Sequence, residues 1–161
     1  MIRPIAHRIF GTEWFPGIDA DPHLYVLHAY NLGNGIAAYY GSDSQYPREA
    51  VAQSNEHEMF YVNLDTMGST IGTPYYEGVL AHEFQHMIHF YQKNILRYAN
   101  ISDQTDTWIN EMLSESTEDL VATKIRHIGP RGVDYLDGSA GDSDNILGRY
   151  PLFNEKNTLL S

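Results

Sequence analysis

The feature that most restricts the fold is a change in the period of the hydrophobic residues at Thr73-Pro74. Thr73 suits the N-cap of a helix, and Pro74 suits the first helical position, where its missing N–H costs nothing. Beyond this point the apolar residues recur at helical spacing, at Tyr76, Leu80, Phe84, Met87, Ile88 and Tyr91. The other side of the same segment is polar, with His82, His86, His89 and Lys93. The sequence therefore predicts a long helix that begins at Thr73-Pro74.

Segments typical of strands precede this helix, and a second helical segment follows it. Aromatic and β-branched residues between turn signals predict strands at 23–29, 36–40 and 59–64. The second helix is expected to open near Asp106 and to run to about His127, before the helix-stopping pair at 129–130. Strands followed by two long helices predict an α+β fold.

The composition indicates one globular domain and excludes several classes of protein. Hydrophobic residues make up 42% and charged residues 19% of the 161 residues, which excludes a disordered chain. The net charge of −11 argues against nucleic acid as a partner, because phosphate binding needs a basic surface. No apolar run approaches the length of about 20 residues that is needed to cross a bilayer. The absence of cysteine excludes disulfides, thiolate metal sites and cysteine nucleophiles.

We expect residues 1–161 to form a single domain cut from a longer chain. The sequence ends at 157–161 in a mildly apolar segment with no obvious terminal cap. Its first residues contain no apolar stretch of signal-peptide length. The segment itself therefore carries no targeting signal that we can identify.

The motif His82-Glu83-Phe84-Gln85-His86 lies inside the first predicted helix. Histidines at i and i+4 are one turn apart on one face, so both imidazoles can reach the same metal ion. Glu83 can point at a water beside that ion and accept its proton. Because three fixed positions also occur by chance, the motif alone is moderately specific, and a polar helix face is the competing interpretation.

The second predicted helix supplies carboxylates at the same spacing. Glu111 and Glu115 are i and i+4, hence on one face. A catalytic zinc site needs a third protein ligand and one open position, and Glu111 can be that ligand. Glu115 can then accept the ring N–H of a ligand histidine. Acids without any Lys or Arg between Arg97 and Lys124 favour a cation site over a mixed, solvated helix face.

The segments HEFQHMIHF and TWINEMLSESTEDLV together resemble the glutamate-ligand zincins, the clan that includes thermolysin. Within that clan the chain looks most similar to the hyicolysin family of zinc metallopeptidases. The resemblance implies a zincin-like fold, in which a mostly antiparallel sheet precedes the HExxH helix and a second helix carries the glutamate ligand. It also implies a zinc-dependent endopeptidase with one zinc ion per chain, acting on protein or peptide substrates, secreted or at the cell surface.

The same resemblance assigns roles to individual residues. It implies that the zinc ligands are His82, His86 and Glu111 and that the catalytic base is Glu83. Glu115 would support His82, with Asn110 also beside the ligands. The chain departs from a complete zincin because the helical lower lobe is at most partial. No motif identifies the residue that would stabilise an oxyanion, for which the candidates are His127, Tyr135 and Tyr150.

The strand predicted at 36–40 is the better candidate for the edge that would hold an extended substrate. Edge strands tend to be short, and the irregular polar sequence from Gly41 onward leaves this one free on one side. A substrate can add to such an edge as one more strand. We therefore expect Ala38, Tyr39 and Tyr40 to contact substrate, the alternative being an interior hairpin strand.

Other interpretations remain open at this point. The chain could be a non-catalytic zinc-binding domain, although such a site has no use for Glu83. Glu83 and His86 also fit the Glu-x-x-His pair of di-iron carboxylate proteins, which would need a second such pair and four long helices. His89 is expected to be a surface or cleft-lining residue rather than a fourth metal ligand. Calcium could bind at 17–21 or 137–144, but neither fits the EF-hand spacing, and polar turns are the better interpretation.

Overall fold

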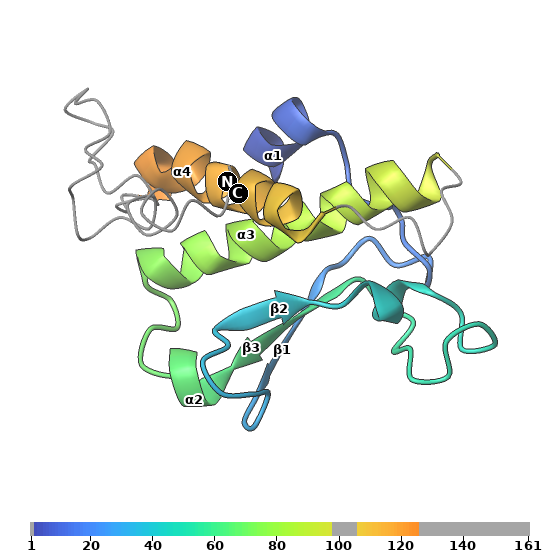
Figure 1. The fold of residues 1–161 in the computed structure, drawn as a ribbon, viewed down its shortest axis with the longest axis horizontal. Coiled ribbons are helices and arrows are strands. Elements are labelled where there is room, and N and C mark those ends of the chain that lie inside the picture. The colour runs from blue at the N-terminus through green and yellow to red at the C-terminus, as the bar shows by residue number, and fades with distance from the viewer. Residues whose placement is uncertain (1, 98–105, 126–161) are drawn as a thin grey trace.

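The computed structural model describes residues 2–97 and 106–125, which form an α+β fold (Figure 1). Its elements are, in order, α1 (Ile2–Phe10), β1 (Tyr25–Ala29), β2 (Ala38–Tyr40), the 3₁₀ turn η1 (Ser42–Gln45), β3 (Met59–Asn63), α2 (Leu64–Met67), α3 (Pro74–Phe90), its π-helical continuation η2 (Tyr91–Ile95) and α4 (Thr107–Ile125). The three strands and two long helices expected from the sequence are all present. Residues 128–161 lie outside the described residues.

The sheet is mixed rather than mostly antiparallel as expected. The strand order is β1-β3-β2, with β3 parallel to β1 and antiparallel to β2. Parallel neighbours need a long connection, and here residues 30–58 provide it and carry β2 on the way. Because β3 inserts between the two earlier strands, β2 pairs on one side only among the described residues. The expectation that this strand forms an edge is confirmed for Ala38–Tyr40.

Helix α3 is the middle layer of the molecule, between the sheet on one side and α1 with α4 on the other (Figure 1). Its buried residues face both layers. Phe84 packs edge-on against Phe60 of β3, with 6.5 Å between ring centroids. Ala81 meets Val121 of α4. A helix buried on opposite sides explains why apolar residues occupy so much of the α3 circumference.

The start of α3 is confirmed at the predicted position. Thr73 has an extended backbone, and its side chain accepts a hydrogen bond from the N–H of Tyr76 at 3.4 Å. Pro74 takes the first helical position, as expected. The cap sets where the turns of α3 begin, and thereby which residues face α4.

Helix α1 was not expected, because the first third of the sequence was interpreted as strands and turns. Its apolar residues nevertheless follow a helical pattern, and Pro4 lies in the first turn, where proline is tolerated. Ile2 and Ile5 pack against the contact between α3 and α4, and Ala6 is fully buried. Helix α1 therefore packs against both long helices and supports them.

Helix α4 covers Thr107–Ile125, close to the predicted range of 106–127. Within 2–97 and 106–125, no helix combines the length and apolar character that a membrane crossing requires. The deepest residues of α4 include Val121 and Ala122, and Val121 packs against α3 and α1.

Because Met87 of α3 is fully buried, we expect Met87→Ala to lower the free energy of unfolding by about 2–5 kcal/mol. The cost comes from lost apolar contacts and from the cavity that the smaller side chain leaves. Met112→Ala on the exposed surface of α4 is the matched control, because Met112 is 41% exposed. Urea unfolding followed by circular dichroism measures both; equal effects of the two substitutions would contradict the packing described here.

Candidate metal centre

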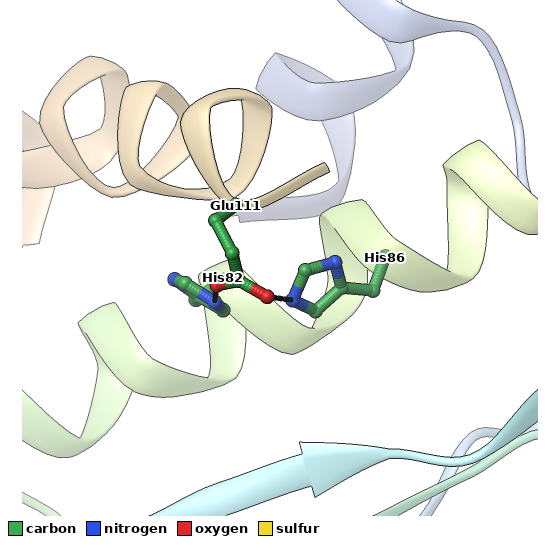
Figure 2. Close-up of side chains that lie close together, drawn as sticks. All are labelled: His82, His86 and Glu111. Atoms are coloured by element: carbon green, nitrogen blue, oxygen red, sulfur yellow. Dashed lines mark ion pairs between the residues drawn. The ribbon is translucent and has the colours of Figure 1, made fainter. Parts of the chain in front are cut away.

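Two histidines of α3 face α4 side by side (Figure 2). His82 and His86 are one turn apart, and their rings lie nearly perpendicular with 4.8 Å between centroids. Both side chains are largely buried between the helices. The i, i+4 spacing thus brings the two imidazoles to one side of the helix, as the sequence predicts.

Glu111 of α4 reaches between these two rings (Figure 2). Its Oε2 lies 3.2 Å from Nε2 of His82, and its Oε1 lies 3.7 Å from Nε2 of His86. One donor atom from each residue lies within 4.8 Å of the others. Tetrahedral zinc with donors at about 2.0–2.1 Å holds neighbouring donors about 3.3 Å apart. The chemistry and spacing of these three side chains therefore fit a divalent metal ion.

A second carboxylate holds His82 from its other nitrogen. Nδ1 of His82 is 3.0 Å from Oε1 of Glu118 and 3.7 Å from Oε1 of Glu115. The sequence assigned this support to Glu115, whereas the hydrogen bond in the structure goes to Glu118. Along a helix, i+7 is rotated by only about 20° from i, and i+4 by about 40°. Glu118 is therefore better aligned with Glu111, and the two acids bracket the ring.

The charge around His82 is strongly negative. Burial alone would lower the pKa of His82, but hydrogen bonds to Glu111 and Glu118 outweigh it and raise that pKa to about 10. Carboxylates on both sides of one imidazole thus favour a positive charge at this position. A divalent cation bound to Nε2 would supply the positive charge that these carboxylates favour.

His86 has a different environment, which favours its neutral form. Burial and the neighbouring His82 both lower the pKa of His86. The Oγ of Ser114 donates to Oε1 of Gln85 at 2.8 Å and lies 3.0 Å from Nδ1 of His86. With its proton directed to Gln85, Ser114 accepts the Nδ1–H of His86, so the lone pair of Nε2 faces Glu111.

Sequence reasoning missed three of these supporting residues: Gln85, Ser114 and Glu118. Each one falls inside the two motifs that carry the ligands. The signal that could have found them is helical spacing, since Ser114 and Glu118 lie one and two turns beyond Glu111 on the same side. The direction in which α4 crosses α3 decides which of these acids meets which nitrogen. Residue spacing alone does not predict that direction.

Glu83 lies in the wall of a cavity of about 350 Å³ that also includes both histidines and Glu111. Its side chain is 6% exposed. Burial raises the pKa of Glu83 to about 7, against the lowering effects of His82 and of the Tyr40 backbone hydrogen bond. A carboxylate with a pKa in this range is well matched to accept and release a proton near neutral pH.

The other residues singled out in the sequence divide into those inside this cavity and those elsewhere. The cavity is also lined by Ala38, Tyr39, Tyr40, His89 and Asn110. His89 is thus part of the cavity wall, one of the two places expected for it, and within the described residues it does not join the three-residue group. His127, Tyr135, Tyr150 and the segment 137–144 lie outside the described residues.

The turn at 17–21, considered for calcium, uses its carboxylates within the protein. Oδ1 of Asp19 accepts the N–H of Asp21 at 2.9 Å. Oδ2 of Asp19 lies 2.6 Å from Nδ1 of His57. These bonds are typical of a polar turn.

Fold and site together define a small α+β protein with a candidate His/His/Glu metal centre between two helices. No protein-family model matches the chain, and neither a curated protein nor a solved structure matches it. The resemblance to glutamate-ligand zincins therefore stays a prediction from two motifs, and the metal centre stands on its own geometry.

We expect one divalent metal ion per chain, and we expect Glu111→Gln to weaken zinc binding because the amide is a poorer ligand than the carboxylate. The loss should exceed the roughly 10–100-fold that is typical for a residue outside the ligand set. Competition with a chromophoric chelator measures it. His89→Gln is the matched control inside the same cavity and should leave zinc affinity unchanged; two ions per chain, or equal losses in both variants, would contradict the three-ligand group.

Glu118→Gln is expected to reduce metal affinity by about 10–100-fold, because it removes the charge that orients and polarises His82. Glu115→Gln should have the smaller effect, since its oxygen lies 3.7 Å from the same nitrogen. The same chelator competition compares the two variants, with circular dichroism to show that both are folded. A larger loss in Glu115→Gln would reverse the roles that the distances indicate.

Proposed function

We propose that the chain is a zinc-dependent endopeptidase, in which Glu83 is the general base. The observation that carries the proposal is one cavity that contains the His82, His86 and Glu111 group, the buried Glu83 and the free edge of β2. A peptidase needs these three parts together: a metal group, a base beside it and a place to hold an extended chain.

The donor set fits zinc among the common metals. Two imidazole nitrogens and one carboxylate oxygen, with a position left for water, are the ligand pattern of catalytic zinc in peptidases. When bound, zinc supplies Lewis acidity, which lowers the pKa of water and polarises a carbonyl group. Neutral His86, held by Ser114, and His82, held by Glu118, present the nitrogens that this requires.

Glu83 supplies the proton transfers in this proposal. Its carboxylate accepts a proton from the attacking water and returns it to the nitrogen of the leaving amine as the peptide bond breaks. Both steps need a group whose pKa lies close to the working pH, and burial brings the pKa of Glu83 to about 7. A site that held a metal for structure alone would have no use for a carboxylate at this position, which favours turnover over the non-catalytic alternative.

The edge of β2 supports a peptide as substrate. Ala38, Tyr39 and Tyr40 line the cavity and pair only with β3 among the described residues. An extended chain can pair with a free edge through its backbone, so binding tolerates many side chains. The position of this edge beside Glu83 is the second reason for proposing a peptide bond as the target.

The di-iron alternative is less well supported. It needs a bundle of four long helices, and a three-stranded sheet occupies one side of α3 in the described chain. Location at the cell surface or outside the cell, together with the hyicolysin-like character, stays a prediction from the resemblance of the two motifs.

We expect Glu83→Gln to retain zinc and to lose turnover of an unstructured protein substrate by at least about 10²–10⁴-fold, the usual contribution of a general base. The amide keeps the shape of the side chain and removes its basic oxygen. Glu77→Gln, on the exposed first turn of the same helix, is the control and should keep full activity.

Zinc content and hydrolysis rate are measured on the same samples, with and without chelator. An active Glu83→Gln variant would contradict the role of Glu83 as general base. A fully zinc-loaded chain without hydrolytic activity would overturn the proposed function, while leaving the metal centre in place.

A further inference from the structure

A second cavity, of about 390 Å³, adjoins the metal cavity at the C-terminal end of β2. Tyr39, Tyr40 and Ser42 line both cavities, so the two meet along this strand. The second cavity continues onto the face of the sheet that is turned away from α3. A substrate held along β2 would therefore have room for one of its side chains here.

Two stacked tyrosines form one wall of the second cavity. Tyr39 and Tyr61 are paired across β2 and β3, with 4.6 Å between ring centroids and 7° between planes. The hydroxyl of Tyr61 is anchored by Ser44 at 2.8 Å and by Asn55. Stacking covers one face of each ring, and because β2 is the edge strand, no further strand of the described sheet covers Tyr39. The wall is a rigid aromatic surface with an open side.

The same cavity is also lined by polar residues, one of which is acidic. These are Asp43, Ser44 and Gln53, with Asp43 in the first turn of η1. The arginine nearest in sequence, Arg48, is directed to Glu56 at 3.6 Å instead. Among the residues that the structure describes, no Lys or Arg lines either cavity, and Glu111 and Glu83 add to the negative charge of the first one. The protein as a whole carries a net charge of −11.

We propose that this second cavity is a subsite for a basic side chain, arginine or lysine, of the peptide substrate; the proposal rests on the proposed function. The aliphatic stem of such a side chain lies along Tyr39, and its cation reaches the carboxylate of Asp43. A guanidinium also stacks well on an aromatic ring and makes paired hydrogen bonds to a carboxylate. A cavity lined by both a tyrosine pair and a carboxylate thus offers a partner to each part of such a side chain.

An apolar or aromatic substrate side chain fits less well. It would use the tyrosine wall but would cover Asp43 and Gln53 without giving them partners, which is unfavourable for polar groups taken from water. These polar residues thus select against side chains that the tyrosines alone would accept.

The test uses the full chain, loaded with zinc, and a quenched fluorescent peptide of alanine and glycine. One arginine is moved through successive positions, and each peptide is compared with its twin that contains citrulline, which has the same shape without the charge. At one position we expect arginine to raise kcat/KM by about three- to tenfold over citrulline, in the range of an exposed ion pair combined with a cation–π contact.

Asp43→Asn should bring the arginine-to-citrulline ratio to within about twofold, because it removes the charge and keeps the shape. Glu49→Gln is the matched control: it changes the net charge of the protein by the same amount, is exposed, and lines neither cavity. It should leave the ratio as it is. An equal fall in both variants would assign the preference to the overall charge and overturn the subsite.

Binding separates this proposal from the proposed function. Dye-labelled arginine and citrulline peptides are titrated with zinc-loaded Glu83→Gln, with and without Asp43→Asn, and followed by fluorescence anisotropy. Cleavage without any arginine preference overturns the basic subsite and leaves the peptidase. Arginine-selective binding that depends on Asp43, in a chain that cleaves no peptide, supports the subsite and overturns the peptidase.

Discussion

The packing of α4 against α3 is the constraint on which the metal centre depends, because neither helix carries all the candidate ligands. His82 and His86 come with α3, and Glu111 meets them only because α4 lies along the same side. The small side chain of Ala81, against Val121, lets the two helices approach, and α1 supports them from behind. The site is therefore a property of a helix–helix interface, which the HExxH segment by itself does not create.

The buried carboxylates at this interface favour a cation. Glu83, Glu115 and Glu118 are buried beside Glu111, and burying carboxylates near one another is costly unless positive charge or hydrogen bonds offset it. His82 supplies part of that compensation, as the rise of its pKa to about 10 indicates. A divalent ion at the three-ligand group offsets more of it. The acidic residues of the site are thus also a physical reason why this interface favours a bound metal ion.

Local signals in the sequence were sufficient to predict the long helices and the spacing of the two histidines. They were insufficient to predict how distant segments pair and pack. The cap at Thr73, the one-turn spacing of His82 and His86 and the ranges of both long helices depend on neighbouring residues, and the structure agrees with them. The parallel pairing of β1 with β3 depends on contacts between distant segments, and so does the choice of Glu118 over Glu115. Helix α1 differs from the two long helices in being short, at nine residues, so its amphipathic pattern spans few turns and is a weak local signal.

Strand β2 connects the sheet to the site, and two of its properties are related: its short length and its unpaired edge within the described sheet. A free edge is a hazard for a soluble protein, because unpaired backbone groups can pair with another chain. Here the edge that is free within the described sheet is only Ala38–Tyr40 long, and it lines the same cavity as Glu83 and Glu111. The backbone of Tyr40 forms a hydrogen bond with Glu83, so one group of the edge is already used to place the proposed base. A longer edge would invite aggregation, and a covered one would leave no room for a substrate. A short edge that lines the cavity of Glu83 and Glu111 limits the first risk and leaves the room that the second requires, and it lies where the proposed base could reach an extended chain.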